Sequence, residues 1–270
     1  MTEPLPRPRK RFGQNFLTDR NVLFRIIGTA GILPGEPVLE IGPGRGALTR
    51  LLAAAAGRVV AVEVDRDLAA HLTAEFASDQ RVEIVTADVL DCDLAELLGT
   101  RHPGRWRVVA NLPYNISTQV LFRLLDTMQL FSGLTLMLQK EVAERIASGP
   151  EGKEYGILSV FCLLHCDVSL AFTVKPGSFF PVPKVSSAIL QLAPLPVPRF
   201  DVGDEMFFRR LVKSAFGNRR KTLWNCLKGR FASDDGHLRH ALDVCGIDCD
   251  RRGETLSLEE FATLSRAIQS

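Results

Sequence analysis

The sequence has no hydrophobic run near the roughly 20 residues that a membrane-spanning helix needs. Its first residues, MTEPLPRPRKRFGQNF, are basic but lack the apolar stretch of a secretory signal. No internal repeat is present, which argues against a solenoid or propeller. These absences predict a cytoplasmic protein with no membrane association.

The sequence also lacks a cysteine pattern typical of disulfide-linked or zinc-binding domains. The pairs Cys162/Cys166 and Cys245/Cys249 are spaced more widely than the usual ligands of a structural zinc site. Free cysteine is among the most buried residue types. We therefore expect the six cysteines to pack in the core and to bind no metal.

The composition suits a folded protein that buries a large core. The chain has 270 residues, of which 46% are hydrophobic and 24% are charged. A chain of this size can form one large domain together with a small one.

The positive charges are gathered in two places, although the formal net charge is only +2. Residues 209–230 contain eight Lys or Arg side chains and no acid. A second basic group lies near the start and comprises Arg7, Arg9, Lys10, Arg11 and Arg20. Two such groups in a nearly neutral chain favour a polyanionic partner over two solvated faces.

From residue 37 onward, short β-rich runs alternate with helical stretches. The runs lack polar alternation, as expected for parallel strands covered on both faces, and comprise 37–42, 58–65, 82–88, 106–113 and 134–140. Helices are expected between them at 46–56, 66–77 and 117–128. This rhythm predicts an α/β fold with a Rossmann-like, mostly parallel sheet, whose ligands bind at the carboxyl ends of its strands.

The last third of the chain changes character. Two strand-like runs, CDVSLAFTVKP and KVSSAILQLAP, are joined by a connection short enough for an antiparallel pair at one edge of the sheet. The proline-rich stretch 193–203 is typical of a linker, and a helical pattern follows it. We expect a basic N-terminal segment with a first helix at 1–36, a catalytic domain at 37–195 and a small helical domain at 204–270.

The first strand ends in EIGPGRG, and a helix follows at once. Glycines such as Gly42 and Gly44 let the backbone pass close to a ligand and free the first helical amides to meet it. The second strand ends in Glu63, where an acid faces the hydroxyls of a ribose. The combination predicts a nucleotide site.

Two nucleotide classes fit this turn. Read as G-x-G-x-x-A, with Gly42, Gly44 and Ala47, it also allows a nicotinamide oxidoreductase. Glu40 before the glycines and a third glycine at 46 instead match the E-x-G-x-G-x-G arrangement of S-adenosylmethionine-dependent methyltransferases. Asp88, after the third strand, could hold an adenine amino group by a charge-assisted hydrogen bond.

The fourth strand ends in Asn111-Leu112-Pro113-Tyr114, which matches the [DNS]-P-P-[YFW] motif of methyltransferases that act on exocyclic amines. Such an amine is a poor nucleophile because its lone pair is delocalised into the ring, so it needs orientation more than deprotonation. The Asn111 side-chain oxygen and the Leu112 carbonyl can accept its two hydrogens. Pro113 stiffens the turn, and Tyr114 offers a ring on which the base can stack.

With GQNFL at 13–17 and FFPVPKV at 179–185, the sequence closely resembles the rRNA adenine N6-dimethyltransferases, from about residue 9 to its C-terminus. Within that family it is most similar to the bacterial small-subunit type linked to kasugamycin sensitivity. The resemblance implies dimethylation, from S-adenosyl-L-methionine, of two adjacent adenosines near the 3′ end of 16S rRNA. The implied partner is an immature small ribosomal subunit, and the enzyme is expected to be a monomer.

The resemblance also implies roles for individual residues. Phe179 would close on the target base opposite Tyr114, while Phe180 would be a packing residue, although the sequence leaves open that the two exchange roles. The implied cofactor-binding residues are Gln14, Asn15, Leu17, Gly42, Gly44, Glu63, Asp88 and Asn111. The implied contacts to RNA phosphates are Arg209, Arg210, Arg219, Arg220 and Lys221.

Three alternatives stay open at this stage. The large-subunit rRNA adenine methyltransferases of the macrolide-resistance type share the fold and chemistry. An RNA-binding assembly factor could methylate only as a secondary activity. A nicotinamide oxidoreductase would leave the two basic groups and the NLPY motif without a role.

Overall fold

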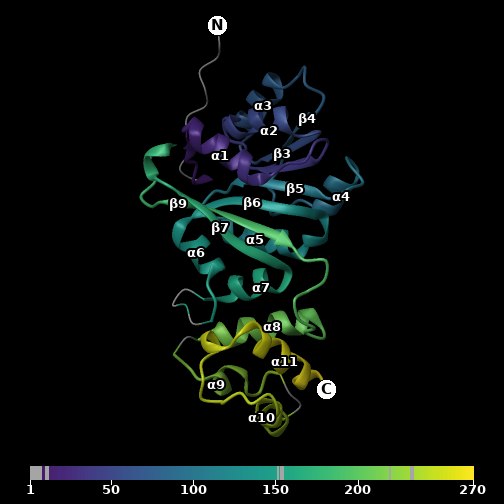
Figure 1. Ribbon diagram of the computed structural model, residues 1–270, viewed down its shortest axis with the longest axis vertical. Helices are drawn as coiled ribbons and strands as arrows, with labels where there is room; N and C mark the ends of the chain where they lie inside the picture. Colours follow the sequence, from purple (N-terminus) through teal and green to yellow (C-terminus); the bar gives the residue numbers. More distant parts are fainter. Residues whose placement is uncertain (1–7, 10–11, 151, 153–154, 219, 232–233) are drawn as a thin grey trace. The chain divides into compact units, whose positions relative to one another are not determined.

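The computed structural model describes residues 8–9, 12–150, 152, 155–218, 220–231 and 234–270 (Figure 1). The chain forms two compact units. The sheet unit comprises Met1–Ala143 with Val168–Pro194, and the helical unit comprises Glu144–Asp167 with Leu195–Ser270.

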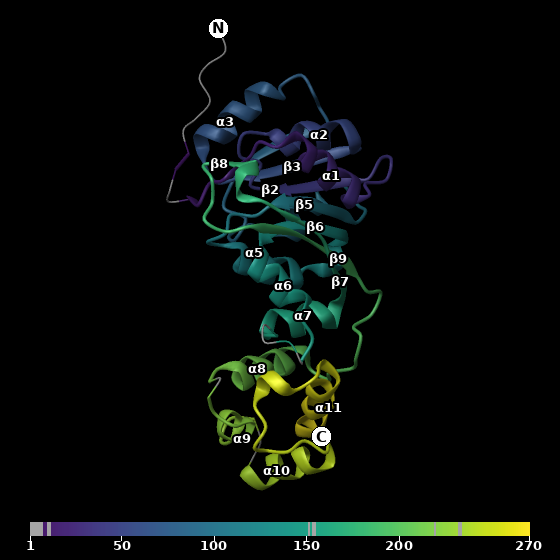
Figure 2. The same ribbon diagram turned by 60° about the vertical axis from the view of Figure 1, so that its left-hand side comes forward.

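Among the described residues, the sheet unit contains a seven-stranded sheet of order β4-β3-β2-β5-β6-β9-β7. The part of this order from β3 to β7 can be followed in Figure 2. The strands are β2 Pro37–Ile41, β3 Arg58–Glu63, β4 Val82–Thr86, β5 Trp106–Asn111, β6 Phe131–Gln139, β7 Cys166–Val174 and β9 Ser187–Pro194. Pairing is parallel from β4 to β6 and antiparallel between β6 and β9. The expected mostly parallel sheet with an antiparallel part at one edge is confirmed.

The central strands are buried because their apolar runs are covered by helices. All five residues of β2 are buried, and α1 and α2 pack Leu23, Ile26 and Leu52 against the sheet residues Val38 and Val109. The helices of this region are α1 Arg20–Ala30, α2 Ala47–Ala55, α3 Arg66–Glu75, α4 Leu94–Gly99, α5 Ser117–Asp126 and α6 Lys140–Ala147, with the short 3-10 helices η2 Met128–Leu130 and η3 Pro176–Ser178.

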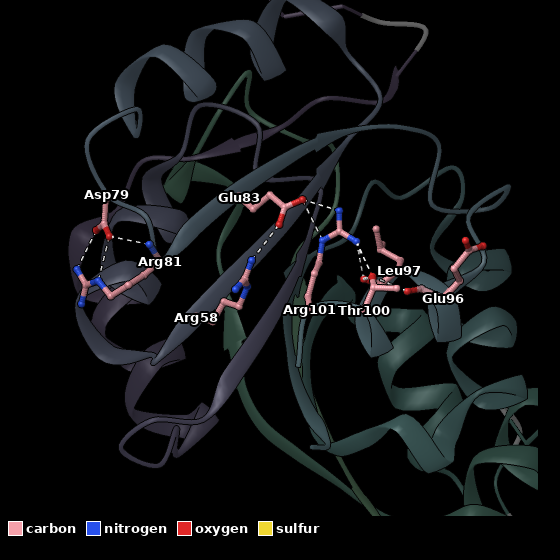
Figure 3. A network of polar contacts seen from close by, with 8 residues as sticks. All are labelled: Arg58, Asp79, Arg81, Glu83, Glu96, Leu97, Thr100 and Arg101. Carbon is pink, nitrogen blue, oxygen red and sulfur yellow. Dashed lines mark hydrogen bonds and ion pairs between the residues drawn. The ribbon is translucent and has the colours of Figure 1, made fainter. Parts of the chain in front are cut away.

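Strand β4 lies at one edge of the sheet and carries charged contacts that Figure 3 shows. Glu83 accepts from Arg101 and, at 3.2 Å, from Arg58 on β3. The hydrogen bond from Arg101 is the main reason that the pKa of Glu83 is lowered. Charges on an edge strand oppose pairing with a second chain.

A second, two-stranded ribbon was not predicted. It pairs β1 (Phe16–Leu17) with β8 (Phe179–Phe180) in antiparallel register, so that Phe16 faces Phe180 and Leu17 faces Phe179. Strands of two residues give no periodic signal in the sequence. The ribbon brings the GQNFL and FFPVPKV segments together. Next to it, the Thr18 hydroxyl donates to the Ser178 carbonyl, a contact between residues 160 positions apart in the sequence.

The helical unit contains α7 Ile157–His165, α8 Glu205–Phe216, α9 Leu223–Leu227, α10 Asp235–Val244, the 3-10 helix η4 Gly253–Thr255 and α11 Leu258–Gln269 (Figure 1). The expected division at 37–195 and 204–270 was wrong for residues 144–167. Helix α7 belongs to the helical unit because Phe161 packs against Phe208, with ring centroids 6.3 Å apart. Helix α1 of the predicted N-terminal segment packs on the sheet and so joins the sheet unit.

The predicted linker at 193–203 is held along its length. Leu195 donates its N–H to the backbone carbonyl of His165 at 2.8 Å, and Arg199 donates its N–H to the backbone carbonyl of Leu164 at 2.8 Å. The Arg199 guanidinium also donates to the Leu163 carbonyl at 2.9 Å. From Leu195 onward the segment is thus part of the packed helical unit.

The six cysteines are free, and Cys162, Cys166 and Cys226 are buried as expected, whereas the other three are half-buried. Burial raises the pKa of Cys166 to about 12 and that of Cys162 well above its usual value. A buried thiol that keeps its proton is a poor zinc ligand. None of the described helices is long and apolar enough to cross a membrane.

Candidate active site

A cavity of about 890 Å³ opens in the sheet unit at the carboxyl ends of β2, β3, β4 and β5. Its lining combines segments that are distant in sequence, with residues drawn from 12–18, 40–51, 62–64, 87–89 and 111–116. Open α/β sheets bind ligands at this edge. The cavity therefore lies where the sequence predicts a nucleotide site.

The glycine turn between β2 and α2 forms one wall of the cavity. Gly42, Gly44 and Gly46 have φ values of 68°, 58° and 73°, in the left-handed region that glycine adopts most readily. A Cβ atom on Gly44 would lie 3.0 Å from two carbons of the Phe16 ring. Conformation and space therefore both require glycine at position 44.

Glu63, the last residue of β3, is 5% exposed and lines the cavity. Its Oε2 accepts from the Gly44 N–H at 3.0 Å, and its Oε1 accepts from the Asp65 N–H at 2.9 Å. Burial raises the pKa of Glu63, while these backbone donors oppose the shift. Each carboxylate oxygen has a second lone pair, so the group can still accept from two ribose hydroxyls.

Glu40 is a second buried acid beside the turn, at 2% exposure. Its pKa is raised to about 8, chiefly by burial and also by the nearby Glu63, while the Thr49 hydroxyl opposes the shift. Within the described residues, its Oε2 has no hydrogen-bond donor. Glu40 is therefore protonated at neutral pH, which explains how two acids can share this wall.

Asp88 follows β4 and reaches the same cavity. Its Oδ1 accepts from the Leu90 N–H at 2.9 Å, which holds the carboxylate in place. The group retains acceptor capacity for an amine. The three predicted strand ends, with Gly42, Glu63 and Asp88, thus meet in one cavity.

Asn111 ends β5, and its amide has a defined orientation. Its Nδ2 donates to the backbone carbonyl of Asn15 at 3.2 Å. Because a carbonyl oxygen only accepts, the amide nitrogen must face Asn15, which leaves Oδ1 as the acceptor available at the cavity. This is the orientation that a substrate amine requires.

The rest of the NLPY turn is anchored on both sides. Leu112 is buried and donates its N–H to Met137 at 3.2 Å. The Tyr114 hydroxyl bonds to Ser187 Oγ at 2.6 Å, and burial raises the pKa of this tyrosine. Pro113 lies beside the glycine turn, with its Cδ 3.6 Å from where a Cβ on Gly42 would stand. The predicted catalytic turn is therefore held rigidly at the cavity.

The N-terminal segment covers part of the cavity, and Gln14, Asn15 and Leu17 all line it. Leu17 is also buried in the core cluster with α1. The Gln14 side chain bonds to Asp65 at 3.1 Å and to the Arg9 N–H at 2.7 Å. Both ends of the Gln14 amide are thus engaged by the protein, which points to a structural role near the cofactor.

The two phenylalanines of FFPVPKV have the opposite accessibility to that expected. Phe179 is 2% exposed and belongs to the core cluster, whereas Phe180 is 53% exposed. Of the two roles left open from the sequence, packing therefore falls to Phe179 and not to Phe180. The reason is the ribbon register, which turns alternate side chains to opposite faces and directs Phe179 inward beside Leu17.

The predicted RNA-contacting residues of the helical unit divide into two groups. Arg209 is half-buried, donates to Glu205 at 3.0 Å and lies over the Phe161 ring. Arg210, Arg220 and Lys221 are exposed, and Arg219 lies outside the described residues. Of the second basic group, Arg7, Lys10 and Arg11 also lie outside them.

Two residues that support the site were not predicted from the sequence. Ser187, the partner of Tyr114, is 73 positions away, and no local pattern marks it. Asp65 was assigned to the end of a strand but caps α3, accepting from the Asp67 N–H at 3.1 Å. An aspartate directly before a helical pattern is a signal that could have identified the cap.

Comparison with known proteins agrees with this geometry. The family model described as "Ribosomal RNA adenine dimethylase" matches residues 6–270. The "Ribosomal RNA small subunit methyltransferase A" of Geobacter metallireducens is 57% identical over 265 residues, covering 98% of this chain and 96% of that protein. The protein of the same name from Geobacter sulfurreducens is 58% identical over 264 residues, covering 97% and 95%.

Two solved structures are similar to this chain over nearly its whole length. A dimethyladenosine transferase from Plasmodium falciparum superposes with a TM-score of 0.74 at 25% identity, covering 92% of this chain and 95% of that one. The 23S rRNA methyltransferase ErmE superposes with a TM-score of 0.70 at 27% identity, covering 95% and 100%.

Fold and site together define a Rossmann-like methyltransferase. The glycine turn and the asparagine at the end of β5 line the same cavity, at the edge of the sheet where its parallel strands end. The chain belongs to the ribosomal RNA adenine dimethylase family. Membership of this family rules out the nicotinamide oxidoreductase.

Proposed function

We propose that the protein transfers methyl groups from S-adenosylmethionine to N6 of two adjacent adenosines near the 3′ end of 16S rRNA, two groups to each. The observation that carries this proposal is the Asn111 amide, whose nitrogen faces the Asn15 carbonyl and whose oxygen is left for a substrate amine. The 57% identical relative named for the small ribosomal subunit supports the choice of RNA.

The residues present fit S-adenosylmethionine. Glu63 retains lone pairs for ribose hydroxyls, Asp88 offers a carboxylate to the adenine amine, and Gly42 leaves room for close approach. When bound, the cofactor supplies an electrophilic methyl group on a sulfonium. The half-buried Asn15 and the buried Leu17 cover this part of the cavity.

The chain's own residues act mainly by orientation. Asn111 Oδ1 and the Leu112 carbonyl accept the amine hydrogens, which turns the nitrogen lone pair toward the methyl group. Positioning of this kind can supply several kcal/mol of the barrier without a general base. The raised pKa of Tyr114 keeps its hydroxyl protonated, so its ring stays neutral for stacking on the base.

A second aromatic ring is expected to contact the target base opposite Tyr114. The family pattern assigns it to Phe179, whose burial would require β8 to move before a base could reach the ring. Phe180 is exposed on the same ribbon, with the Arg45 guanidinium 5.8 Å from its ring centroid. We therefore propose Phe180 as the ring that an entering nucleotide meets first.

Replacing Gly44 by alanine should weaken cofactor binding about tenfold, since relief of the roughly 1–2 kcal/mol that a positive φ costs an L-residue would shift the turn, and the new Cβ would press on Phe16. Calorimetric titration with S-adenosylmethionine measures this. Gly99→Ala is the matched control, because a Cβ there meets no atom within 4 Å. Equal affinity in the two variants would contradict the proposed approach of the ligand to the turn.

The exposed side chains of Arg210, Arg220 and Lys221 are proposed to meet RNA phosphates. Changing both Arg220 and Lys221 to alanine should weaken RNA binding and lower the slope of log K against log salt by about 2, roughly one for each phosphate that is no longer neutralised. Filter binding at several salt concentrations measures the slope. Arg266→Ala, which removes an arginine outside 209–230, should leave the slope unchanged.

The decisive experiment is transfer of labelled methyl from S-adenosylmethionine to undermethylated small ribosomal subunits, with large subunits in parallel. Dimethyladenosine in the small-subunit RNA alone is the expected result. Label in the large-subunit RNA would favour the second candidate, which the likeness to ErmE supports. Tight subunit binding without label would make the protein an assembly factor that does not depend on catalysis.

We further propose that the enzyme is a cytoplasmic monomer and that its substrate is an immature small subunit. The target base must leave its stack to enter the cavity, which is easiest where the RNA is not yet fully packed. Comparison of precursor and mature subunits in the same assay tests the proposed stage.

A further inference from the structure

We infer that Asp65 is a positioning residue that fastens the N-terminal segment over the cofactor cavity and sets Glu63 at the same time. This inference rests on the proposed function, because it concerns retention of S-adenosylmethionine. Asp65 is 2% exposed, and its carboxylate contacts both Arg9 and Gln14.

The first half of the argument is the contact with the N-terminal segment. Arg9 donates to Asp65 Oδ1 at 3.0 Å, and Gln14 donates to Asp65 Oδ2 at 3.1 Å. Arg9 also donates its backbone N–H to Gln14 at 2.7 Å, so the two partners are tied to each other. We call this arrangement of Arg9, Gln14 and Asp65 the clasp.

The second half is the contact with the ribose-binding acid. The Asp65 N–H donates to Glu63 Oε1 at 2.9 Å, and the Asp65 carboxylate caps α3 through the Asp67 N–H. One residue therefore fixes the position of the Glu63 carboxylate from one side and the cover of the cavity from the other. Its charge is buried, so it requires partners to balance it.

The clasp closes a cover that directly lines the cavity. Residues 12–18, which follow Arg9, contribute to the lining, and the Phe16 ring lies against the glycine turn. The clasp, the β1–β8 ribbon and the bond from Asn111 to Asn15 all help to hold this segment. Without the clasp, the N-terminal segment is no longer fastened at Asp65, close to Glu63. We expect S-adenosylmethionine then to stay bound for a shorter time.

The test compares the two ion pairs that the Arg9 side chain makes, one with Asp65 and one with Asp67. Arg9 also pairs with Asp67, whose side chain is 60% exposed, whereas that of Asp65 is 1% exposed. Arg9→Ala should raise the dissociation rate and the Kd of S-adenosylmethionine about tenfold, because a cover that is no longer fastened opens more often and lets the cofactor leave. Asp67→Asn, which removes the exposed pair alone, should change both by less than twofold.

Stopped-flow displacement and calorimetry give the binding constants, and the methyl transfer assay separates the kinetic effects. Arg9→Ala should raise KM for S-adenosylmethionine while kcat stays unchanged. Arg9→Lys, which keeps the charge, should restore part of the affinity. Asp65→Asn serves as the second variant, with its melting temperature as a check on folding.

The outcomes are distinct. If the wild-type protein binds no S-adenosylmethionine, the proposed function fails and the clasp with it. If the wild-type protein binds it and Arg9→Ala binds equally tightly and releases it equally slowly, the clasp alone is overturned. Equal effects of Asp67→Asn and Arg9→Ala would assign the retention to the exposed pair and would likewise overturn the role of Asp65.

Discussion

Replacing Asn111 by alanine is expected to lower methyl transfer at least about 1,000-fold, equivalent to about 4 kcal/mol of the barrier. The change removes the oxygen that orients the amine and the nitrogen that bonds to Asn15 at 3.2 Å. RNA affinity should change less than about twofold, because phosphate contacts on other residues dominate it. Single-turnover methyl transfer and RNA binding, measured on the same preparation, test both statements.

Asn111→Asp separates orientation from simple loss of packing. The carboxylate keeps an acceptor toward the amine but cannot donate to the Asn15 carbonyl, so it should retain more activity than Asn111→Ala. Asn21→Ala, on exposed surface of α1, is the control for removal of an asparagine elsewhere in the sheet unit. Activity within tenfold of wild type in Asn111→Ala would refute the proposed role of the amide. Affinity for S-adenosylmethionine, determined separately, shows how much of the loss comes from the cofactor.

Glu40→Gln is expected to make the protein more stable in alkaline solution. The pKa of Glu40 in the folded protein, about 8, lies above its ordinary value of 4.5 because the side chain is buried. Between these two values the unfolded chain gives up the proton and the folded chain keeps it. Stability therefore falls as pH rises through this window, by about 1.4 kcal/mol per pH unit. Glutamine is neutral throughout and removes this cost.

The difference in unfolding free energy between Glu40→Gln and wild type should widen by about 3 kcal/mol from pH 5.5 to pH 8. Urea unfolding of the cofactor-free proteins at several pH values measures it. Glu96→Gln is the matched control, because Glu96 is exposed and its removal should give no such widening. Parallel pH profiles for Glu40→Gln and wild type would mean that Glu40 ionises normally in the folded protein.

Much of the site could be predicted because its signals are local. A glycine with positive φ, an acid after an apolar run and a proline after an asparagine each depend on a few neighbouring residues. Parallel strands bring their carboxyl ends to one edge, so Gly42, Glu63, Asp88 and Asn111 could be placed together before any contact was known. The cavity contains all four.

Other features depend on contacts that no local pattern encodes. Adjacent phenylalanines have the same chemistry, and only pairing of β8 with β1 decides that Phe179 is buried and Phe180 exposed. The apolar run of α7 was assigned to the catalytic domain, yet its burial against α8 places it in the helical unit. A basic run gives no sign that Arg209 turns toward Glu205 while Arg210 stays in solvent.

The class of fold and the strand ends that carry the chemistry could be predicted from the sequence, because they follow from backbone conformation and short-range periodicity. The family was predicted from the resemblance of its GQNFL, NLPY and FFPVPKV motifs. The tertiary structure alone decided which residues support those strand ends. Arg9 and Asp65 are 56 positions apart, and Tyr114 and Ser187 are 73 apart. Pairs so distant meet only when the whole chain packs, because their contact comes from the arrangement of complete elements and not from the residues between them.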